Sequence, residues 1–235
     1  MKLLVIYETF LLHFRPQGWW PVTKEGELIP KYHQSNDLTE SQMLEICLGA
    51  ILTQNTNWKN VEKTIINLCK NKLIDIEKII RIQDKKLAEI IKSSGYHNQK
   101  AKKLKNFCKF LSNNHGGSLI KLFENDLKTL REELLSINGV GPETADSIIL
   151  YAAKKPIFVI DAYTKRILNR IGYQEKTYEE LQNLFMQKLP NNEKLFNEYH
   201  ALLVELGKNI CKKEPFCEKC PINNHCNYYK KWYYQ

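Results

Sequence analysis

Four cysteines close to residue 220 constrain the fold of this chain more than any other feature. They occur as Cys211-x5-Cys217-x2-Cys220-x5-Cys226. Four thiolates within so short a segment are enough to ligate one tetrahedral metal ion or a cubane iron–sulfur cluster. Structural zinc sites usually pair two Cys-x2-4-Cys units, and only one pair here has that spacing. The pattern therefore favours a structural [4Fe-4S] cluster, with zinc as the alternative.

The other three cysteines, Cys47, Cys69 and Cys108, stand alone. This distribution is unlike a disulfide framework and indicates a reducing compartment. No apolar run reaches the ~20 residues that a membrane span needs, and the first residues lack the charges and cleavage site of a signal peptide. We therefore expect a cytoplasmic protein without a membrane segment.

Hydrophobic residues recur with the 3.6-residue period of α-helices along most of the chain. Thr39 and Gln42 form a capping-box pattern that predicts a helix start, and a second helix is predicted from Trp58. The one extended stretch, residues 156–160, is too isolated to build a sheet. The predicted fold class is therefore all-α.

Lysine and arginine number 35 against 26 aspartates and glutamates, which gives a net charge of +9. Such an excess favours a polyanionic partner, with nucleic acid ahead of an anionic membrane surface. Residues 95–105 carry four lysines and no acid. This segment is either a solvated helix face or a surface that contacts phosphates.

A tight turn is predicted at Gly139-Val140-Gly141, between two apolar helical stretches. Glycines at both ends leave room for an approaching backbone, and Pro142 suits the first position of the next helix. Amide groups at that helix start, together with Thr144, would suit a DNA phosphate. The pattern favours a helix-hairpin-helix motif over a plain helix–helix turn.

Asp161 follows this motif by about twenty residues, where an apolar stretch turns into a helix. A carboxylate at a helix start is held ionised by the helix dipole, which suits a group that must face developing positive charge. The alternative role is that of an N-cap alone.

Taken together, these residues resemble the helix-hairpin-helix DNA glycosylases of the endonuclease III superfamily, from about Trp19 to Cys226. The resemblance implies an enzyme of base-excision repair that flips a damaged base out of double-stranded DNA and hydrolyses its N-glycosidic bond. It implies that Asp161 is catalytic and that the four cysteines hold a [4Fe-4S] cluster. It also implies DNA contacts by the hairpin and by a side chain that fills the space left by the flipped base: Gly139, Val140, Gly141, Thr144 and, as the inserted residue, Gln54.

The mechanism implied by this resemblance turns on Glu143. Bifunctional members carry a lysine at that position, two residues after the second hairpin glycine, and its amine forms a Schiff base that leads to strand cleavage. A carboxylate cannot form an imine. The sequence therefore predicts a monofunctional glycosylase, unless another lysine substitutes.

Four features occur together in the chain: Trp19-Trp20-Pro21, the run Leu-Thr-Gln-Asn-Thr around Gln54, Trp58 just after it, and Glu143. In this combination the chain most resembles the 3-methyladenine DNA glycosylase III branch. Electron-rich indole faces attract the positive charge of an N-methylated purine and stack on its flat ring. By resemblance, the base pocket consists of Trp19, Trp20, Pro21, Trp58 and Lys208. The alternative for the tryptophans is ordinary core packing. The best-known type of this branch lacks the cysteine loop, which this chain has.

Three other functions stay open. An endonuclease III-like glycosylase/lyase for oxidised pyrimidines would need an amine nucleophile, whereas an adenine or mismatch glycosylase would not. A non-catalytic DNA-binding module is the third. The expected architecture is a monomer with two helical lobes: a six-helix-barrel-like domain at residues 39–153 that ends in the hairpin motif, and a cluster domain built from residues 1–38 and 154–235.

Overall fold

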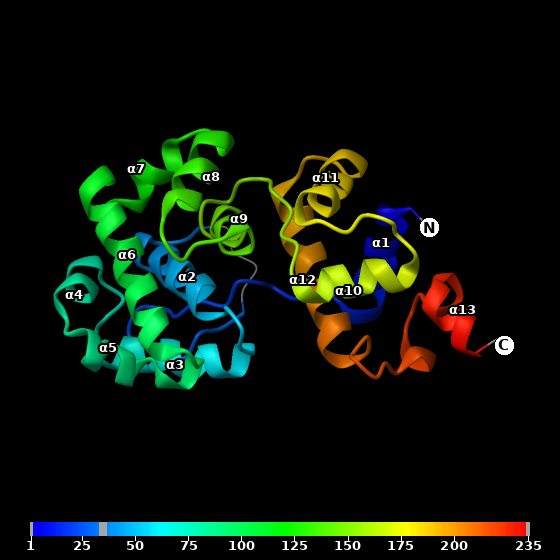
Figure 1. Cartoon of the computed structure of the whole chain (residues 1–235), viewed down its shortest axis with the longest axis horizontal. Coiled ribbons are helices and arrows are strands. Elements are labelled where there is room, and N and C mark those ends of the chain that lie inside the picture. The colour runs from blue at the N-terminus through cyan, green and yellow to red at the C-terminus, as the bar shows by residue number, and fades with distance from the viewer. Residues whose placement is uncertain (1, 33–36, 234–235) are drawn as a thin grey trace. The chain divides into compact units, whose positions relative to one another are not determined.

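The computed structural model describes residues 2–32 and 37–233, and no strand forms within them. Two backbone hydrogen bonds between Val22 and Lys31 make a single isolated bridge. The all-α prediction is confirmed (Figure 1). The helices are α1 Leu3–Phe14, α2 Glu40–Leu52, α3 Trp58–Lys70, α4 Ile76–Arg81, α5 Asp84–Ile90, α6 His97–His115, α7 Leu119–Glu124, α8 Leu127–Ser136, α9 Pro142–Tyr151, α10 Ala162–Ile171, α11 Tyr178–Lys188, α12 Glu193–Asn209 and α13 Asn227–Tyr233, with short 3₁₀ turns η1 Lys92–Ser94, η2 Cys217–Lys219 and η3 Asn223–His225.

The helices fall into two compact units. The central unit is Trp20–Lys155, and the terminal unit combines Met1–Trp19 with Pro156–Gln235. The sequence placed residues 20–38 with the terminal residues, but the described residues of this range, 20–32 and 37–38, fall in the central unit. The reason is local packing, because the Trp20 ring lies 5.2 Å from Tyr151 and 5.3 Å from Trp58, both in the central unit.

Helix α2 forms the middle of the central unit, where it packs against α3, α6, α7 and α9 (Figure 1). The predicted capping box is present, with Thr39 and Gln42 bonded to each other's backbone amides. Every residue from Leu44 to Leu52 is buried, which is the pattern of a helix surrounded by others. No helix among the described residues has the length and apolar character needed to cross a membrane.

The terminal unit joins the two ends of the chain around α12, which packs against α1 and α10. Phe158, from the extended stretch, stacks on Phe185 at 3.7 Å and meets Phe196 and Tyr199 edge-on. The buried Tyr199 hydroxyl donates to the Leu3 carbonyl at 2.9 Å. This bond anchors α1 to a residue 196 positions further along the chain.

One buried acid in α2 predicts a pH dependence of stability. Glu45 is 4% exposed, and its Oε1 accepts hydrogen bonds from the Thr23 amide (3.0 Å) and hydroxyl (3.1 Å). Burial raises the pKa of Glu45 from 4.5 to about 7, although the Thr23 bonds act in the opposite direction. Between these two values the folded chain binds a proton that the unfolded chain releases, so the free energy of unfolding falls as the pH rises.

We expect Glu45→Gln to remove this penalty, because glutamine still accepts both bonds and never ionises. The variant should gain about 1–3 kcal/mol of stability at pH 8 and much less at pH 5. Thermal unfolding at the two pH values measures the difference. Glu25→Gln, at an exposed position, is the matched control and should change neither. An equal gain at both pH values would contradict the ionisation argument.

Candidate functional site

The predicted hairpin is present between α8 and α9. Gly139 has a φ of +100°, and a Cβ there would lie 2.4 Å from Cγ of Lys103, so both the backbone and the packing require glycine. Gly141 is the N-cap of α9 and Pro142 its first residue. The two helices are tied by Arg131, which donates to the fully buried Asp146 at 2.7 and 3.2 Å.

Gln54 lies beside this hairpin, in the turn that follows α2. Its Nε2 donates to the Gly139 carbonyl at 3.0 Å and to the Thr144 hydroxyl at 2.9 Å. The structure therefore brings together three residues that the sequence predicted for DNA contact from positions about 90 apart. It also adds Lys103, whose Nζ donates to Gln54 Oε1 at 2.5 Å. The sequence marked its lysine-rich segment but not this residue.

The predicted aromatic residues are divided between the units. Trp20 is 6% exposed, meets Trp58 edge-to-face and packs on Gly49, whose Cβ position lies 3.1 Å from its ring. Pro21 is buried beside it, and Tyr151, which the sequence missed, completes the group. In the terminal unit, Trp19 is half-buried and Lys208 is exposed in the last turn of α12.

Asp161 is the N-cap of α10, and its Oδ1 accepts from the Thr164 amide at 2.7 Å. The other oxygen, Oδ2, lies 3.8 Å from Nε2 of His200 on α12. Asp161 is 9% exposed and His200 is 8% exposed. Burial lowers the pKa of His200, and the Asp161 charge opposes this effect.

All four clustered cysteines line one cavity of the terminal unit, together with Arg170 and Tyr228. Arg170 donates to the Cys211 sulfur at 3.2 Å, and the Cys226 thiol donates to the Arg170 carbonyl at 3.3 Å. Burial raises the pKa of Cys220 to about 12. No group of three or more His, Cys, Asp or Glu side chains in the described part of the chain is arranged to hold a metal ion.

Comparisons with known proteins show the family to which these residues belong. Residues 48–191 match the family described as "HhH-GPD superfamily base excision DNA repair protein". The match spans more than half of the chain, including the Gln54 turn, the hairpin and Asp161.

The chain belongs to this superfamily.

It is accordingly a DNA N-glycosylase of the endonuclease III superfamily. The glycosylase is 42% identical over 224 residues to a Methanocaldococcus jannaschii protein named as a candidate DNA repair glycosylase, with 94% of each chain covered. It is 28% identical over 211 residues to endonuclease III of Thermotoga maritima, covering 87% of this chain and 91% of the relative.

Two solved structures show the same fold. The 3-methyladenine DNA glycosylase of H. pylori, bound to 1,N6-ethenoadenine, matches with a TM-score of 0.72 at 29% identity, over 88% of this chain and 98% of the other. An endonuclease III–DNA complex matches with a TM-score of 0.78 at 20% identity, over 99% of this chain and 97% of the other.

Glu143 stands in the first turn of α9 in this glycosylase and is exposed. Its carbonyl accepts from the Ser147 hydroxyl at 2.7 Å, one turn further along the helix. An acid at this position complements the positive end of the helix dipole.

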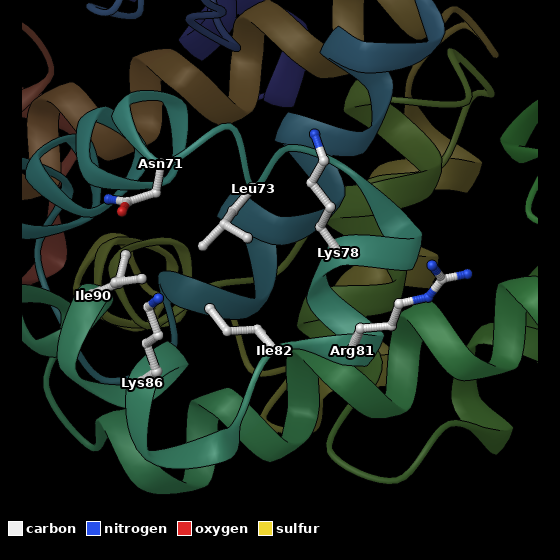
Figure 2. A pocket seen from close by; sticks show the side chains of 7 residues that line it. All are labelled: Asn71, Leu73, Lys78, Arg81, Ile82, Lys86 and Ile90. Atoms are coloured by element: carbon white, nitrogen blue, oxygen red, sulfur yellow. The ribbon is translucent and has the colours of Figure 1, made fainter.

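A separate pocket of about 340 Å³ opens on the central unit around α4 and α5. Figure 2 shows Leu73, Ile82 and Ile90 facing the hollow, whereas the Arg81 guanidinium points away from it. Asn71, Lys78 and Lys86 complete the lining, so none of the residues predicted for DNA or base contact belongs to this pocket.

Proposed function

We propose that this glycosylase removes N-methylated purines from double-stranded DNA by hydrolysis and leaves the abasic strand intact. The observation that carries the proposal is the 29% identity to a 3-methyladenine DNA glycosylase, over 88% of this chain. Half-buried Trp58 supports the same substrate class, because an aromatic face favours a flat base with positive charge. Trp20 and Tyr151 are themselves buried and pack against each other.

The proposed chemistry needs little from the protein, because a methylated purine is already a good leaving group. The bond between C1′ and the base nitrogen breaks, its electron pair leaves with the base, and a water oxygen bonds to C1′. Asp161 is proposed to stabilise the positive sugar or to take the proton of that water. His200 lies 3.8 Å from the carboxylate, and its burial lowers its pKa, which disfavours its charged form.

Glu143 supports the monofunctional part of the proposal. A lyase needs an amine that attacks C1′, and the position that bears it in bifunctional members of this superfamily holds a carboxylate here. Because the position of Gln54 resembles that of the inserted glutamine in other members of the superfamily, we propose that Gln54 is inserted into the duplex. The hairpin residues Gly139 to Gly141 and Thr144 are proposed to hold the DNA backbone. Pro21 is proposed to line the base pocket of the central unit.

The four cysteines match a [4Fe-4S] cluster in the number and type of donors, line one cavity and form no disulfide, although their side chains are not gathered around a metal position. We propose that they hold this cluster as a structural element of the terminal unit. The protein is also proposed to act as a monomer in the cytoplasm, whose reducing conditions suit seven free thiols.

Incubation with duplex DNA tests the substrate. We expect release of methylated purine, with strand breaks only after alkali, from a duplex that carries methylated purines. A thymine glycol duplex of the same sequence should stay intact, and borohydride should trap no covalent adduct. If neither duplex releases a base, the proposal is contradicted.

A second candidate is an endonuclease III-like lyase. The four-cysteine cavity and the 28% identity to the Thermotoga maritima enzyme favour it. Strand breaks on thymine glycol without alkali, together with a trapped adduct, would establish this function and replace the first.

A further inference from the structure

Helix α6 holds the Gln54 turn and the hairpin through a row of polar residues spaced three apart. Lys100 Nζ donates to the carbonyls of Leu52 (2.8 Å) and Ser94 (2.7 Å). Lys103 Nζ donates to Gln54 Oε1, and Asn106 donates to the Asn138 carbonyl at 3.0 Å. One face of α6 thus contacts the end of α2, the Gln54 side chain and the hairpin.

Lys103 fixes the orientation of the Gln54 amide. An ammonium group only donates, so the amide oxygen must face Lys103. The amide nitrogen then faces the Gly139 carbonyl and the Thr144 hydroxyl, and it donates to both. The side chain is held at both ends, with a charge-assisted bond at one of them.

The stem of Lys103 also lies directly against the hairpin. Cγ of Lys103 occupies the space that a side chain at position 139 would need, at 2.4 Å from the Cβ position. A glycine at 139 therefore lets the lysine pass close to the hairpin and reach Gln54. Lys103 contacts the hairpin with its stem and Gln54 with its ammonium group.

The backbone on either side of Gln54 is also constrained, by hydrogen bonds before it and by a left-handed residue after it. The Thr53 amide donates to the Gly49 carbonyl at 2.9 Å, and its hydroxyl donates to the Ala50 carbonyl at 2.8 Å. Asn55 has a φ of +53°, in the left-handed region that asparagine tolerates better than most residues. The tight turn and the hydrogen bonds of the Gln54 side chain together fix the position of this side chain before DNA is bound.

We propose that Lys103 is a positioning residue that holds Gln54 ready for insertion into the duplex. This inference rests on the proposed insertion of Gln54 and adds the residue that prepares it. Insertion of a flexible glutamine would cost the entropy of fixing its rotatable bonds, and the side chain held by Lys103 has already lost that freedom. Lys103 therefore favours complexes in which a space in the duplex is filled.

The test is a ratio of two affinities. Fluorescence anisotropy gives the Kd for a duplex with a central tetrahydrofuran abasic-site analogue and for the matched intact duplex. We expect Lys103→Met to lower the preference for the abasic duplex about fivefold to tenfold. Gln54→Ala and the double variant should lower it to the same extent, because both substitutions remove one interaction. Lys103→Arg should restore most of the preference.

Lys102→Met is the matched control, an exposed lysine next to Lys103 on the same helix. Loss of its charge should weaken binding to both duplexes alike and leave the ratio unchanged. Circular dichroism melting checks that each variant is folded.

Three outcomes would overturn the inference. The first is a double variant whose loss is the product of the two single losses, because Lys103 would then act independently of Gln54. The second is an unchanged ratio in Lys103→Met or in Gln54→Ala. The third is an equal loss of the ratio in Lys102→Met. These measurements use binding alone, so failure of the proposed substrate appears separately, as absent base release.

Discussion

Asp161→Asn should lower the rate of base release by about 100-fold to 1,000-fold and leave the protein folded. Removal of one group that stabilises developing charge typically costs this much. Asparagine is an equally good N-cap, and its side-chain oxygen can still accept from the Thr164 amide. The substitution therefore removes the charge and keeps the helix start. Single-turnover kinetics on the methylated duplex measures the effect.

Asp126→Asn provides a matched control for this experiment. Asp126 is the N-cap of α8 and accepts from the amides of Lys128 and Thr129, so the same chemical change is made at another helix start. We expect this variant to release base at nearly the rate of the unaltered enzyme. Full activity in Asp161→Asn would show that the carboxylate is an N-cap and nothing more.

Cys220→Ser should remove the proposed cluster and destabilise the terminal unit. A [4Fe-4S] protein is brown, so the variant should lose its visible absorbance and its iron, measured by elemental analysis. Binding of a structural metal centre is part of the folding free energy of small metal-holding segments. We therefore expect the segment from Cys211 to Cys226 to become sensitive to trypsin, which cleaves after Lys212, Lys213 and Lys219.

Cys69→Ser is the control for the cysteine experiment, because Cys69 lies in the central unit and outside the cavity. It should keep the absorbance and the iron content. Zinc instead of iron in the unaltered protein would contradict the cluster, and iron that survives Cys220→Ser would contradict this set of ligands.

Features that depend on a few neighbouring residues could be predicted from the sequence. The hairpin follows from two glycines and a proline, and the structure shows why position 139 must be glycine. The helix start at Asp161 follows from the change between an apolar stretch and a periodic one, and the cap bond to Thr164 is present. Each of these signals lies within about ten residues.

Features that depend on residues far apart in the sequence could not be predicted. Trp20 joins the central unit because Gly49 leaves space for its ring and Tyr151 packs against it, and no periodicity links those positions. His200 reaches Asp161 from a helix 39 positions away, and its own surroundings read as an ordinary amphipathic helix. In the sequence Lys103 is one of several lysines in a basic segment, and only the fold shows that Gln54 lies beside it.

The bond between the Tyr199 hydroxyl and the Leu3 carbonyl has a consequence for synthesis on the ribosome. The central unit is continuous in sequence, so its residues are all available once position 155 has been made. Helix α1 is made before the central unit, but its buried face packs on α12, which ends at Asn209. The nascent chain therefore carries an apolar helix without its partner while roughly 200 residues are added, and a segment made before the central unit is buried after it.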